Sequence, residues 1–400
     1  MKRLLYIGVL SIAFFFKSNY VAAQHERTQY PFFLSNHTYF EASVSYIGYH
    51  FSNLQMERGY VAESVHIPHT GVRLVLYGYR FNQHLAVQVS YMRPVLWIQY
   101  KNVNGDHASH SVPTNVAGLT FKWQQPLNKR FMAYTEAGLG IITRSGFSVD
   151  NVPVVKSSNY ASLLVGGGIS YRFSEKLQGL VGGGLSPAYS KDRQPATFFF
   201  SGGVTYNVRR LPQEQVERNK NTPYFFPANL VQVGYITNAA GYGVNNFFAN
   251  PVFPIFWGGD VQVKSGISVH YQRNIFHSHK VFSLDWGVSF SYYKSKNQNT
   301  PFYAASLFPL ARFTAFHSKK ADLYFNYSVA GPTFISKTTI DETKTGKRFT
   351  FQDFMGMGVF AGKTKRINVE IRIAHYSNGD LFPDNNGVMV PLSINAGYTF

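Results

Sequence analysis

The amino-acid sequence predicts an all-β protein made of two tandem eight-stranded up-and-down antiparallel β-barrels. Three observations predict this fold class. Apolar and polar residues alternate with a period of two along most of the chain, long helical periodicity is missing, and the connections between the alternating segments are short and long in turn. One sixteen-stranded barrel is the alternative, because strand periodicity does not by itself fix how many sheets close.

The first 24 residues have the pattern of a secretory signal peptide. Lys2 and Arg3 precede an apolar run from Leu4 to Phe16, and the small residues Ala22 and Ala23 follow. The run is too short to cross a bilayer as a helix, and no later segment has about 18 uninterrupted apolar residues. The chain has no cysteine, so neither a lipoprotein anchor nor a disulfide framework is expected. We therefore expect residues 1–24 to direct export and take no part in the fold.

Residues 25–208 are predicted to form the N-terminal barrel. Its strands are expected at 39–51, 69–81, 84–100, 114–124, 130–142, 160–173, 177–189 and 197–208. Short turns near 82–83, 125–129 and 174–176 alternate with long loops at 52–68, 101–113 and 143–159. Outer-membrane barrels show this alternation, with short turns in the periplasm and long loops outside.

Residues 209–223 interrupt the pattern with a polar segment that has no apolar face, which favours two barrels joined by a linker. Residues 224–400 then repeat the scheme. The strands are expected at 228–238, 263–274, 280–294, 301–316, 321–335, 349–362, 366–378 and 389–400. The last segment alternates cleanly and ends on the aromatic residue Phe400, as suits an interfacial belt.

Composition narrows the class of partner. The formal net charge is +18, but the basic residues are scattered through turns and loops and do not gather on one helix, so nucleic acid is not expected as a partner. An exported basic protein is better suited to anionic lipid head groups. The aromatic content of 17% fits the girdles of a membrane barrel. The predicted location is the cell outer membrane.

The register of the hairpin formed by the sixth and seventh strands of the second half can be predicted from the sequence. A turn centred on Thr364 pairs Met357 with Ile371 and Val359 with Val369, so the apolar faces match along its length. The opposite face of the seventh strand carries Glu370 and Arg372. These two side chains are expected to form a charge network that fills the lumen of a small barrel.

Extending the same register places His375 and Ser377 on the lipid-facing side and sets Asp353 opposite His375. Polar groups on that side cost free energy, which points to a function. Residues two apart on a strand share a face, with Cα atoms about 6.5–7 Å apart. Ser377 is therefore a candidate nucleophile, His375 its base and Asp353 the acid that orients the imidazole. Asn378 could donate a hydrogen bond to a developing oxyanion.

The segment His375-Tyr376-Ser377-Asn378, followed by Leu381 and by Asn385-Asn386-Gly387, resembles the PagL-type lipid A 3-O-deacylases, a family of outer-membrane acyloxyacyl hydrolases. The resemblance covers Arg348 to Phe400 well and the rest of the second half more weakly. It implies an esterase with Ser377 as nucleophile, His375 as base and, by analogy, Asn378 as oxyanion donor.

One position departs from the family. The family's acid is a Glu two residues after the loop glycine, and this chain has Met389 there. Asp353, Asp380 and Asp384 are the remaining candidates for the acid, and the strand register favours Asp353.

The sequence thus predicts a serine esterase that hydrolyses an acyl ester of lipid A at the lipid-facing barrel surface. Lipid A or lipopolysaccharide and outer-membrane lipids are the expected partners, a homo-oligomer is left open, and no cofactor or metal is expected. The paired histidines at 107 and 110 and at 277 and 279 are interpreted as solvated residues of loops and turns. A non-catalytic barrel, acting as a pore, adhesin or structural scaffold, is the alternative, and Met389 favours it.

Overall fold

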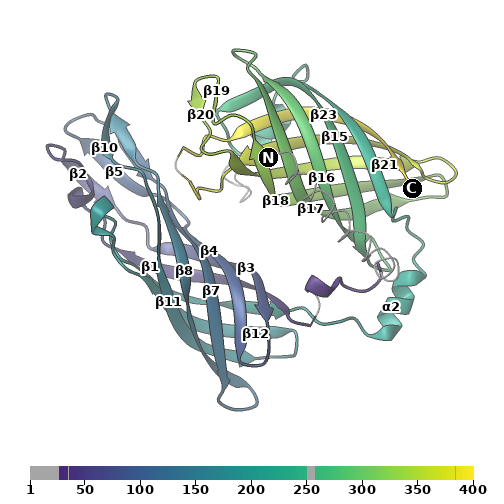
Figure 1. Ribbon diagram of the computed structural model, residues 1–400, viewed down its shortest axis with the longest axis horizontal. Helices are drawn as coiled ribbons and strands as arrows, with labels where there is room; N and C mark the ends of the chain where they lie inside the picture. Colours follow the sequence, from purple (N-terminus) through teal and green to yellow (C-terminus); the bar gives the residue numbers. More distant parts are fainter. Residues whose placement is uncertain (1–26, 35, 250–256, 383) are drawn as a thin grey trace, which may run out of the picture.

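The computed structural model describes residues 27–34, 36–249, 257–382 and 384–400, and the predicted signal peptide lies outside these ranges. The described residues form two closed antiparallel barrels of eight strands each (Figure 1). In the first, β1 pairs with both β3 and β13, and in the second β14 pairs with both β15 and β23. The prediction of two barrels is therefore confirmed, and the sixteen-stranded alternative is wrong.

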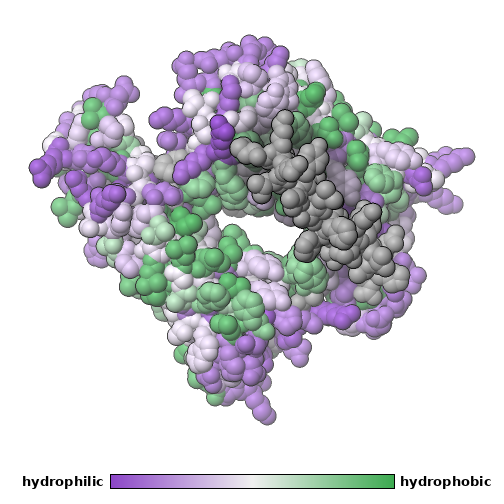
Figure 2. Space-filling view, viewed as in Figure 1, coloured by the Kyte–Doolittle hydropathy of each residue, from purple (hydrophilic) through white to green (hydrophobic). Residues whose placement is uncertain are grey.

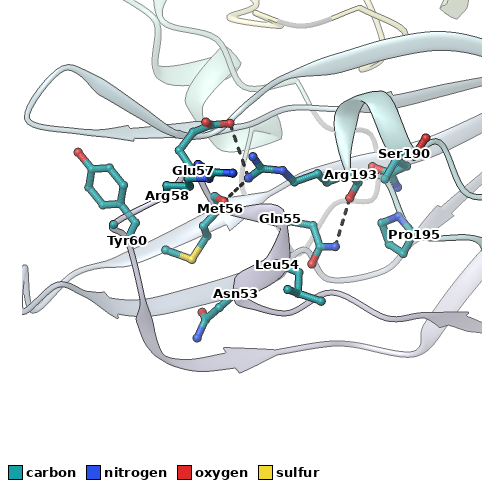
Figure 3. A pocket seen from close by; sticks show the side chains of 12 residues that line it. Asn53, Leu54, Gln55, Met56, Glu57, Arg58, Tyr60, Ser190, Arg193 and Pro195 are labelled. Carbon is teal, nitrogen blue, oxygen red and sulfur yellow. Dashed lines mark hydrogen bonds and ion pairs between the residues drawn. The ribbon is translucent and has the colours of Figure 1, made fainter.

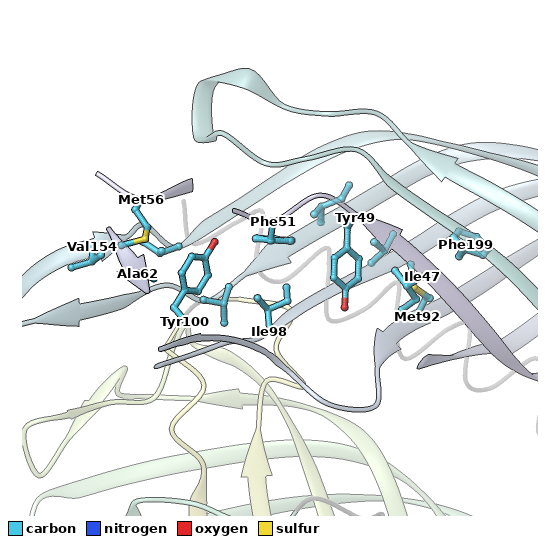
Figure 4. Packing of buried hydrophobic residues seen from close by; sticks show 14 of the residues in the cluster. Ile47, Tyr49, Phe51, Met56, Ala62, Met92, Ile98, Tyr100, Val154 and Phe199 are labelled. Carbon is cyan, nitrogen blue, oxygen red and sulfur yellow. The ribbon is translucent and has the colours of Figure 1, made fainter. Parts of the chain in front are cut away.

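The N-terminal barrel carries additional strands at its long-loop end. Its wall consists of β1 (Thr38–Tyr49), β3 (Thr70–Arg80), β4 (Leu85–Pro94), β7 (Thr114–Pro126), β8 (Phe131–Arg144), β11 (Ser158–Arg172), β12 (Leu177–Ser186) and β13 (Thr197–Asn207). The loops add β2 (Ala62–His66), β5 (Ile98–Val103), β6 (Ser109–Val112), β9 (Phe147–Val149) and β10 (Val152–Val155), together with the 3-10 turns Asn53–Gln55 and Ser190–Asp192. Another 3-10 turn, Phe32–Leu34, precedes β1. Apolar side chains from these loops continue into the top of the lumen as one buried cluster, which includes Ile47, Phe51 and Tyr100 (Figure 4).

One predicted strand of the N-terminal barrel is wrong in extent. Residues 84–100 form two strands, β4 and β5, and not one. Pro94 ends β4, and since proline has no backbone N–H it cannot donate to the sheet beyond that point. The chain then leaves the barrel, and β5 pairs with β2 and β6 in a separate three-stranded sheet.

The segment that joins the barrels contains the short helix α2 (Gln213–Lys220), which begins after Pro212. Its Val216 and Asn219 side chains are buried, and Asn219 Nδ2 donates to the carbonyl of Thr28 at 2.8 Å. No helix within the described ranges is long and apolar enough to cross a membrane.

The C-terminal barrel carries a helix in its first long connection and a small hairpin in a later one. Its wall consists of β14 (Asn229–Thr237), β15 (Val261–His277), β16 (Phe282–Ser295), β17 (Pro301–His317), β18 (Ala321–Ile335), β21 (Phe349–Ala361), β22 (Ile367–Ser377) and β23 (Val388–Thr399). The helix α3 (Gly243–Phe248) lies between β14 and β15, and the hairpin β19 (Thr339–Ile340) with β20 (Thr343–Lys344) lies between β18 and β21.

The outer walls of both barrels are apolar, as lipid requires. Val44, Phe121 and Leu163 are exposed on the first barrel, and Ile267 and Leu307 on the second. In Figure 2 hydrophobic side chains gather on the walls, and hydrophilic ones lie toward the loops and turns. Alternate residues point inward and are polar. Soluble proteins bury apolar side chains and expose polar ones, whereas a membrane barrel is expected to show the reverse arrangement seen here.

Buried ion pairs fill both lumens. In the N-terminal barrel Arg73 contacts Glu41 at 2.8 Å and Glu136 at 2.9 Å. In the C-terminal barrel Arg372 Nε donates to Glu370 Oε1 at 2.7 Å, and the Tyr324 hydroxyl donates to Glu370 Oε2 at 2.7 Å. The charge network expected from Glu370 and Arg372 is therefore present.

Replacing Glu370 with alanine is expected to lower the free energy of unfolding of the C-terminal barrel by about 3–5 kcal/mol, because Arg372 would stay buried without its counter-charge. Denaturant unfolding in detergent or lipid measures this. Glu217→Ala, which removes an exposed carboxylate from α2, is the control and is expected to leave the transition unchanged. Equal midpoints for wild type and Glu370→Ala would show that the luminal pair is not required.

Candidate active site

The β21–β22 hairpin fixes which side chains of β22 face outward. The register is the expected one, with Asp353 opposite His375, Met357 opposite Ile371 and no bulge between the ends of the ladder. Ile367 and Ile371 are 58% and 45% exposed on the outer wall. Because parity is unbroken along the ladder, the odd-numbered His375 and Ser377 lie on that wall as well.

Tyr376 confirms this parity from the other side of the sheet. Its hydroxyl lies 3.0 Å from the Tyr293 hydroxyl and accepts a hydrogen bond from Gln352 Nε2 at 2.9 Å, and all three side chains are buried inside the barrel. The neighbours of Tyr376 along β22 therefore point away from the lumen.

His375 faces outward but is only 1% exposed, because Trp257 and Gly258, which lie shortly before β15, cover it. The Trp257 ring stacks near the imidazole, with ring centroids 6.3 Å apart and planes inclined by 18°. The Gly258 carbonyl lies 2.8 Å from His375 Nε2. Trp257 also packs with Met355 and Ile373 on the same wall. The candidate base is thus covered by protein on the side where lipid would otherwise lie.

Asp353 lies beside the imidazole at ion-pair distance, with its Oδ2 3.9 Å from His375 Nδ1. This separation exceeds that of a hydrogen bond, and His375 Nδ1 has no hydrogen-bond partner in the described part of the chain. The other carboxylate oxygen accepts from the backbone N–H of Ala330 at 2.5 Å, at a β-bulge of β18 where Ala330 has φ +53°. Asp353 therefore accepts a backbone hydrogen bond with one carboxylate oxygen, and its other oxygen faces His375.

The opposite neighbour of His375, on β23, is Met389. The resemblance places the family's acid at this position, so the imidazole has a thioether on one side and the Asp353 carboxylate on the other. Gly387 lies beside the imidazole, and a Cβ added there would lie 2.5 Å from His375 Nε2. Glycine is therefore needed at this position to leave room for the imidazole.

Ser377 ends β22 opposite Phe351 and is partly exposed. Its hydroxyl makes no hydrogen bond to any described residue, while His375 Nε2 is directed at Gly258. The structure thus brings Asp353 and His375 together and leaves Ser377 on the same face without a bond to the imidazole.

Asn378 is fully buried, yet neither its side-chain Nδ2 nor its Oδ1 has a hydrogen-bond partner among the described residues. Its backbone N–H donates to Asn385 Oδ1 at 2.6 Å. A buried amide without a partner costs free energy, so it calls for an explanation. Asn378 directly follows the candidate nucleophile Ser377 in the chain.

The loop that follows is held by Asp380 and Asn385. Asn385 Nδ2 donates to Asp380 Oδ1 at 3.0 Å. Burial raises the pKa of the Asp380 carboxyl, and the hydrogen bond from Asn385 and the charge of Arg93 oppose that effect. Asp380 is therefore engaged within the loop, and no contact joins it to His375 among the described residues.

Sequence reasoning missed Trp257 and Gly258. Both contact His375, although Gly258 is separated from it by 117 positions in the chain and Trp257 precedes Gly258. The only sequence signal was an aromatic residue in a long connection. The described ranges also contain no group of three histidine, aspartate or glutamate side chains placed to share a metal ion.

A shallow pocket lies in the loops of the N-terminal barrel (Figure 3). Arg193 Nη1 donates to the Met56 carbonyl at 2.5 Å and lies 3.9 Å from Glu57, and Gln55 donates to the Arg193 carbonyl at 3.2 Å. These polar groups bind one another, and the pocket is on the other barrel from Ser377.

Two closed antiparallel barrels with apolar outer walls define an outer-membrane β-barrel protein. Residues 265–396 match the family model described as Lipid A 3-O-deacylase (PagL), and residues 37–180 match the OmpA-like transmembrane domain. The C-terminal half therefore carries a PagL lipid A 3-O-deacylase domain, and the N-terminal half carries an OmpA-like barrel.

Among solved structures, the chain is similar to the outer-membrane enzyme PagL, with 16% identity over 43% of this chain and 100% of that one and a TM-score of 0.30. It is also similar to the N-terminal barrel domain of Pseudomonas aeruginosa OprF, with 15% identity over 44% and 98% of the two chains and a TM-score of 0.27. The chain is similar as well to Ail of Yersinia pestis, with 18% identity over 44% of this chain and 97% of that one and a TM-score of 0.28. No curated protein matches the chain.

Proposed function

We propose that the C-terminal barrel hydrolyses the 3-O acyl ester of lipid A by a serine–histidine–acid mechanism at its lipid-facing wall. The observation that carries this proposal is the shared outward face of His375 and Ser377, inside the segment that matches the PagL family. The position of both residues at the long-loop end of β22 supports a substrate in the outer leaflet, where the esters of lipid A lie just below the head group.

In the proposed reaction the Ser377 hydroxyl attacks the ester carbonyl carbon while His375 Nε2 takes its proton. Asn378 Nδ2 donates to the oxyanion of the tetrahedral intermediate. The intermediate collapses as the bond to the sugar oxygen breaks, and the imidazolium returns the proton to that oxygen. Water, activated by the same imidazole, then releases the fatty acid and restores Ser377.

This reaction requires His375 Nε2 to exchange the Gly258 carbonyl for the Ser377 hydroxyl. With a carbonyl at Nε2 and the Asp353 carboxylate near Nδ1, both ring nitrogens face acceptors. A general base needs a free Nε2 and a proton on Nδ1, held by the acid. Catalytic hydrogen bonds often tighten only when the substrate binds, and we expect Asp353 to approach His375 in that complex.

The mass of lipid A tests the proposal. Incubation of purified lipopolysaccharide with the full chain is expected to remove one acyl chain from lipid A and release one equivalent of free fatty acid. The Ser377→Ala chain, incubated in parallel, is the matched control. Identical lipid A masses with both proteins, and no released fatty acid, would contradict the proposal.

A non-catalytic barrel is the second candidate, and Met389 is the observation that favours it. If Asp353 cannot act as the acid, His375 lacks an orienting group and the wall becomes a membrane surface without chemistry. Lipid A that keeps its mass in the presence of the folded wild-type protein would support this candidate.

A further inference from the structure

We propose that the N-terminal barrel is a positioning domain for the active site: its outer wall holds the loop that follows Ser377, and so places the Asn378 oxyanion donor. This inference rests on the proposed function. It gives a role in the same reaction to a barrel that contributes no catalytic residue.

The contact consists of hydrogen bonds from side chains of the N-terminal barrel to three consecutive carbonyls of the loop between β22 and β23. The Tyr91 hydroxyl donates to the carbonyl of Gly379 at 3.0 Å, and Asn115 Nδ2 donates to that of Asp380 at 2.7 Å. The carbonyl of Leu381 accepts from Thr143 Oγ1 at 3.0 Å and from Asn159 Nδ2 at 2.5 Å. The backbone of residues 379–381 is thus held at each residue.

These donors stand on the outer wall of the N-terminal barrel, in positions that parity assigns to lipid. On β8, Thr143 shares the outward face with the exposed residues Leu139 and Ile141. On β7, Asn115 shares it with Leu119 and Phe121.

Polar side chains on this face would normally cost free energy. Thr143 and Asn115 are only 1% and 2% exposed, since the loop covers them. The wall is therefore built to receive this loop. In Figure 4, strands of the C-terminal barrel approach the long-loop end of the N-terminal barrel.

The loop transmits the constraint to Asn378 through its own hydrogen bonds. Asp380, whose carbonyl is held by Asn115, accepts from Asn385 Nδ2 with its carboxylate, and Asn385 Oδ1 accepts from the backbone N–H of Asn378. Leu381, whose carbonyl is held by Thr143, donates its own N–H to the Asn378 carbonyl at 3.1 Å. The carbonyl of Asn378 is therefore bonded to Leu381, which the N-terminal barrel holds, and its N–H is linked through Asn385 to Asp380, which the N-terminal barrel also holds.

Such a constraint acts on the rate and not on substrate affinity. An oxyanion donor stabilises charge that exists only in the transition state, and displacing a catalytic group by about 1 Å costs up to about 100-fold in rate. Releasing the loop should therefore lower kcat and leave KM nearly unchanged.

The test is a full-length chain with both Asn115→Leu and Thr143→Val. These changes remove two donors with little change in shape, and apolar residues suit a lipid-facing wall, so both barrels should still fold. The expected result, with lipid A in detergent micelles, is a fall in kcat of about tenfold with KM within about twofold of wild type. Thr143→Ser, which keeps the hydroxyl, is expected to retain wild-type kcat.

Thr135→Val is the matched control, because it makes the same substitution on the same face of β8 at an exposed position away from the loop. A fall in kcat of less than about threefold in the double variant would overturn the proposal. A loss confined to KM, or an equal loss in Thr135→Val or Thr143→Ser, would also overturn it.

Hydrogen exchange of the loop amides separates this inference from the proposed function. Exchange at residues 378–382 and 384–387 is expected to accelerate in the double variant and to stay unchanged in Thr135→Val, whether or not lipid A is hydrolysed. If the wild-type protein does not hydrolyse lipid A but the loop amides exchange faster in the double variant, the esterase proposal is refuted and the positioning role is not. Unchanged exchange in an active protein would refute the positioning role alone.

Discussion

Replacing Ser377 with alanine is expected to lower the kcat of lipid A deacylation by a factor on the order of 10⁶, the scale of removing the nucleophile of a serine–histidine site. Without the hydroxyl, no acyl-enzyme forms, and water must attack the ester unaided by covalent catalysis. Release of fatty acid from lipid A, followed by mass spectrometry under single-turnover conditions, measures the loss.

Ser328→Ala is the control for this change. Ser328 lies on β18 of the same barrel, is 1% exposed, and its hydroxyl has no hydrogen-bond partner among the described residues. Its removal is expected to leave both folding and activity unchanged. A Ser377→Ala protein that deacylates at the rate of the Ser328→Ala protein would exclude Ser377 as the nucleophile.

Replacing Asp353 with asparagine is expected to lower kcat by about 10²–10⁴, because an amide can hold the imidazole in the wrong tautomer and cannot stabilise the imidazolium. The substitution is well matched to the site. The amide oxygen can still accept from the N–H of Ala330, so the bulge of β18 keeps its hydrogen bond and only the interaction with His375 changes.

Met389→Glu supplies the rescue for Asp353→Asn. Met389 faces His375 from β23, on the side opposite Asp353, so a glutamate there reaches the imidazole from the neighbouring strand. We expect the kcat of the Asp353→Asn, Met389→Glu protein to be about tenfold or more above that of the Asp353→Asn protein. Wild-type activity in Asp353→Asn would show that Asp353 is not the acid.

These predictions depend on features that were readable from the sequence to different extents. The register of the β21–β22 hairpin was predictable because apolar residues must match across two strands and a turn centred on Thr364 sets which residues pair. That register alone placed Asp353 opposite His375 and put His375 and Ser377 on one face. The division of the outer wall from the lumen followed from the same parity.

The number of barrels and the path of the loops were harder to predict from the sequence. Alternation is the same in eight- and sixteen-stranded barrels, and the polar segment 209–223 only favoured two. The exit of β5 from the barrel depends on Pro94 and on partners in β2 and β6, which residues 84–100 do not reveal by themselves. Pairing with distant strands, and not the local pattern, decided these elements.

By itself the sequence determined the β class, the two faces of each strand and the outward placement of the candidate nucleophile and base, because a period of two is a local property of an extended chain. Only the tertiary structure decided that Trp257 and Gly258 cover His375, that Asp353 lies 3.9 Å from it, and that the N-terminal barrel holds the loop after Ser377. These contacts join residues that lie up to hundreds of positions apart in the chain or depend on exact side-chain positions. They arise from the closure of the two barrels and their packing against each other, for which no local periodicity exists.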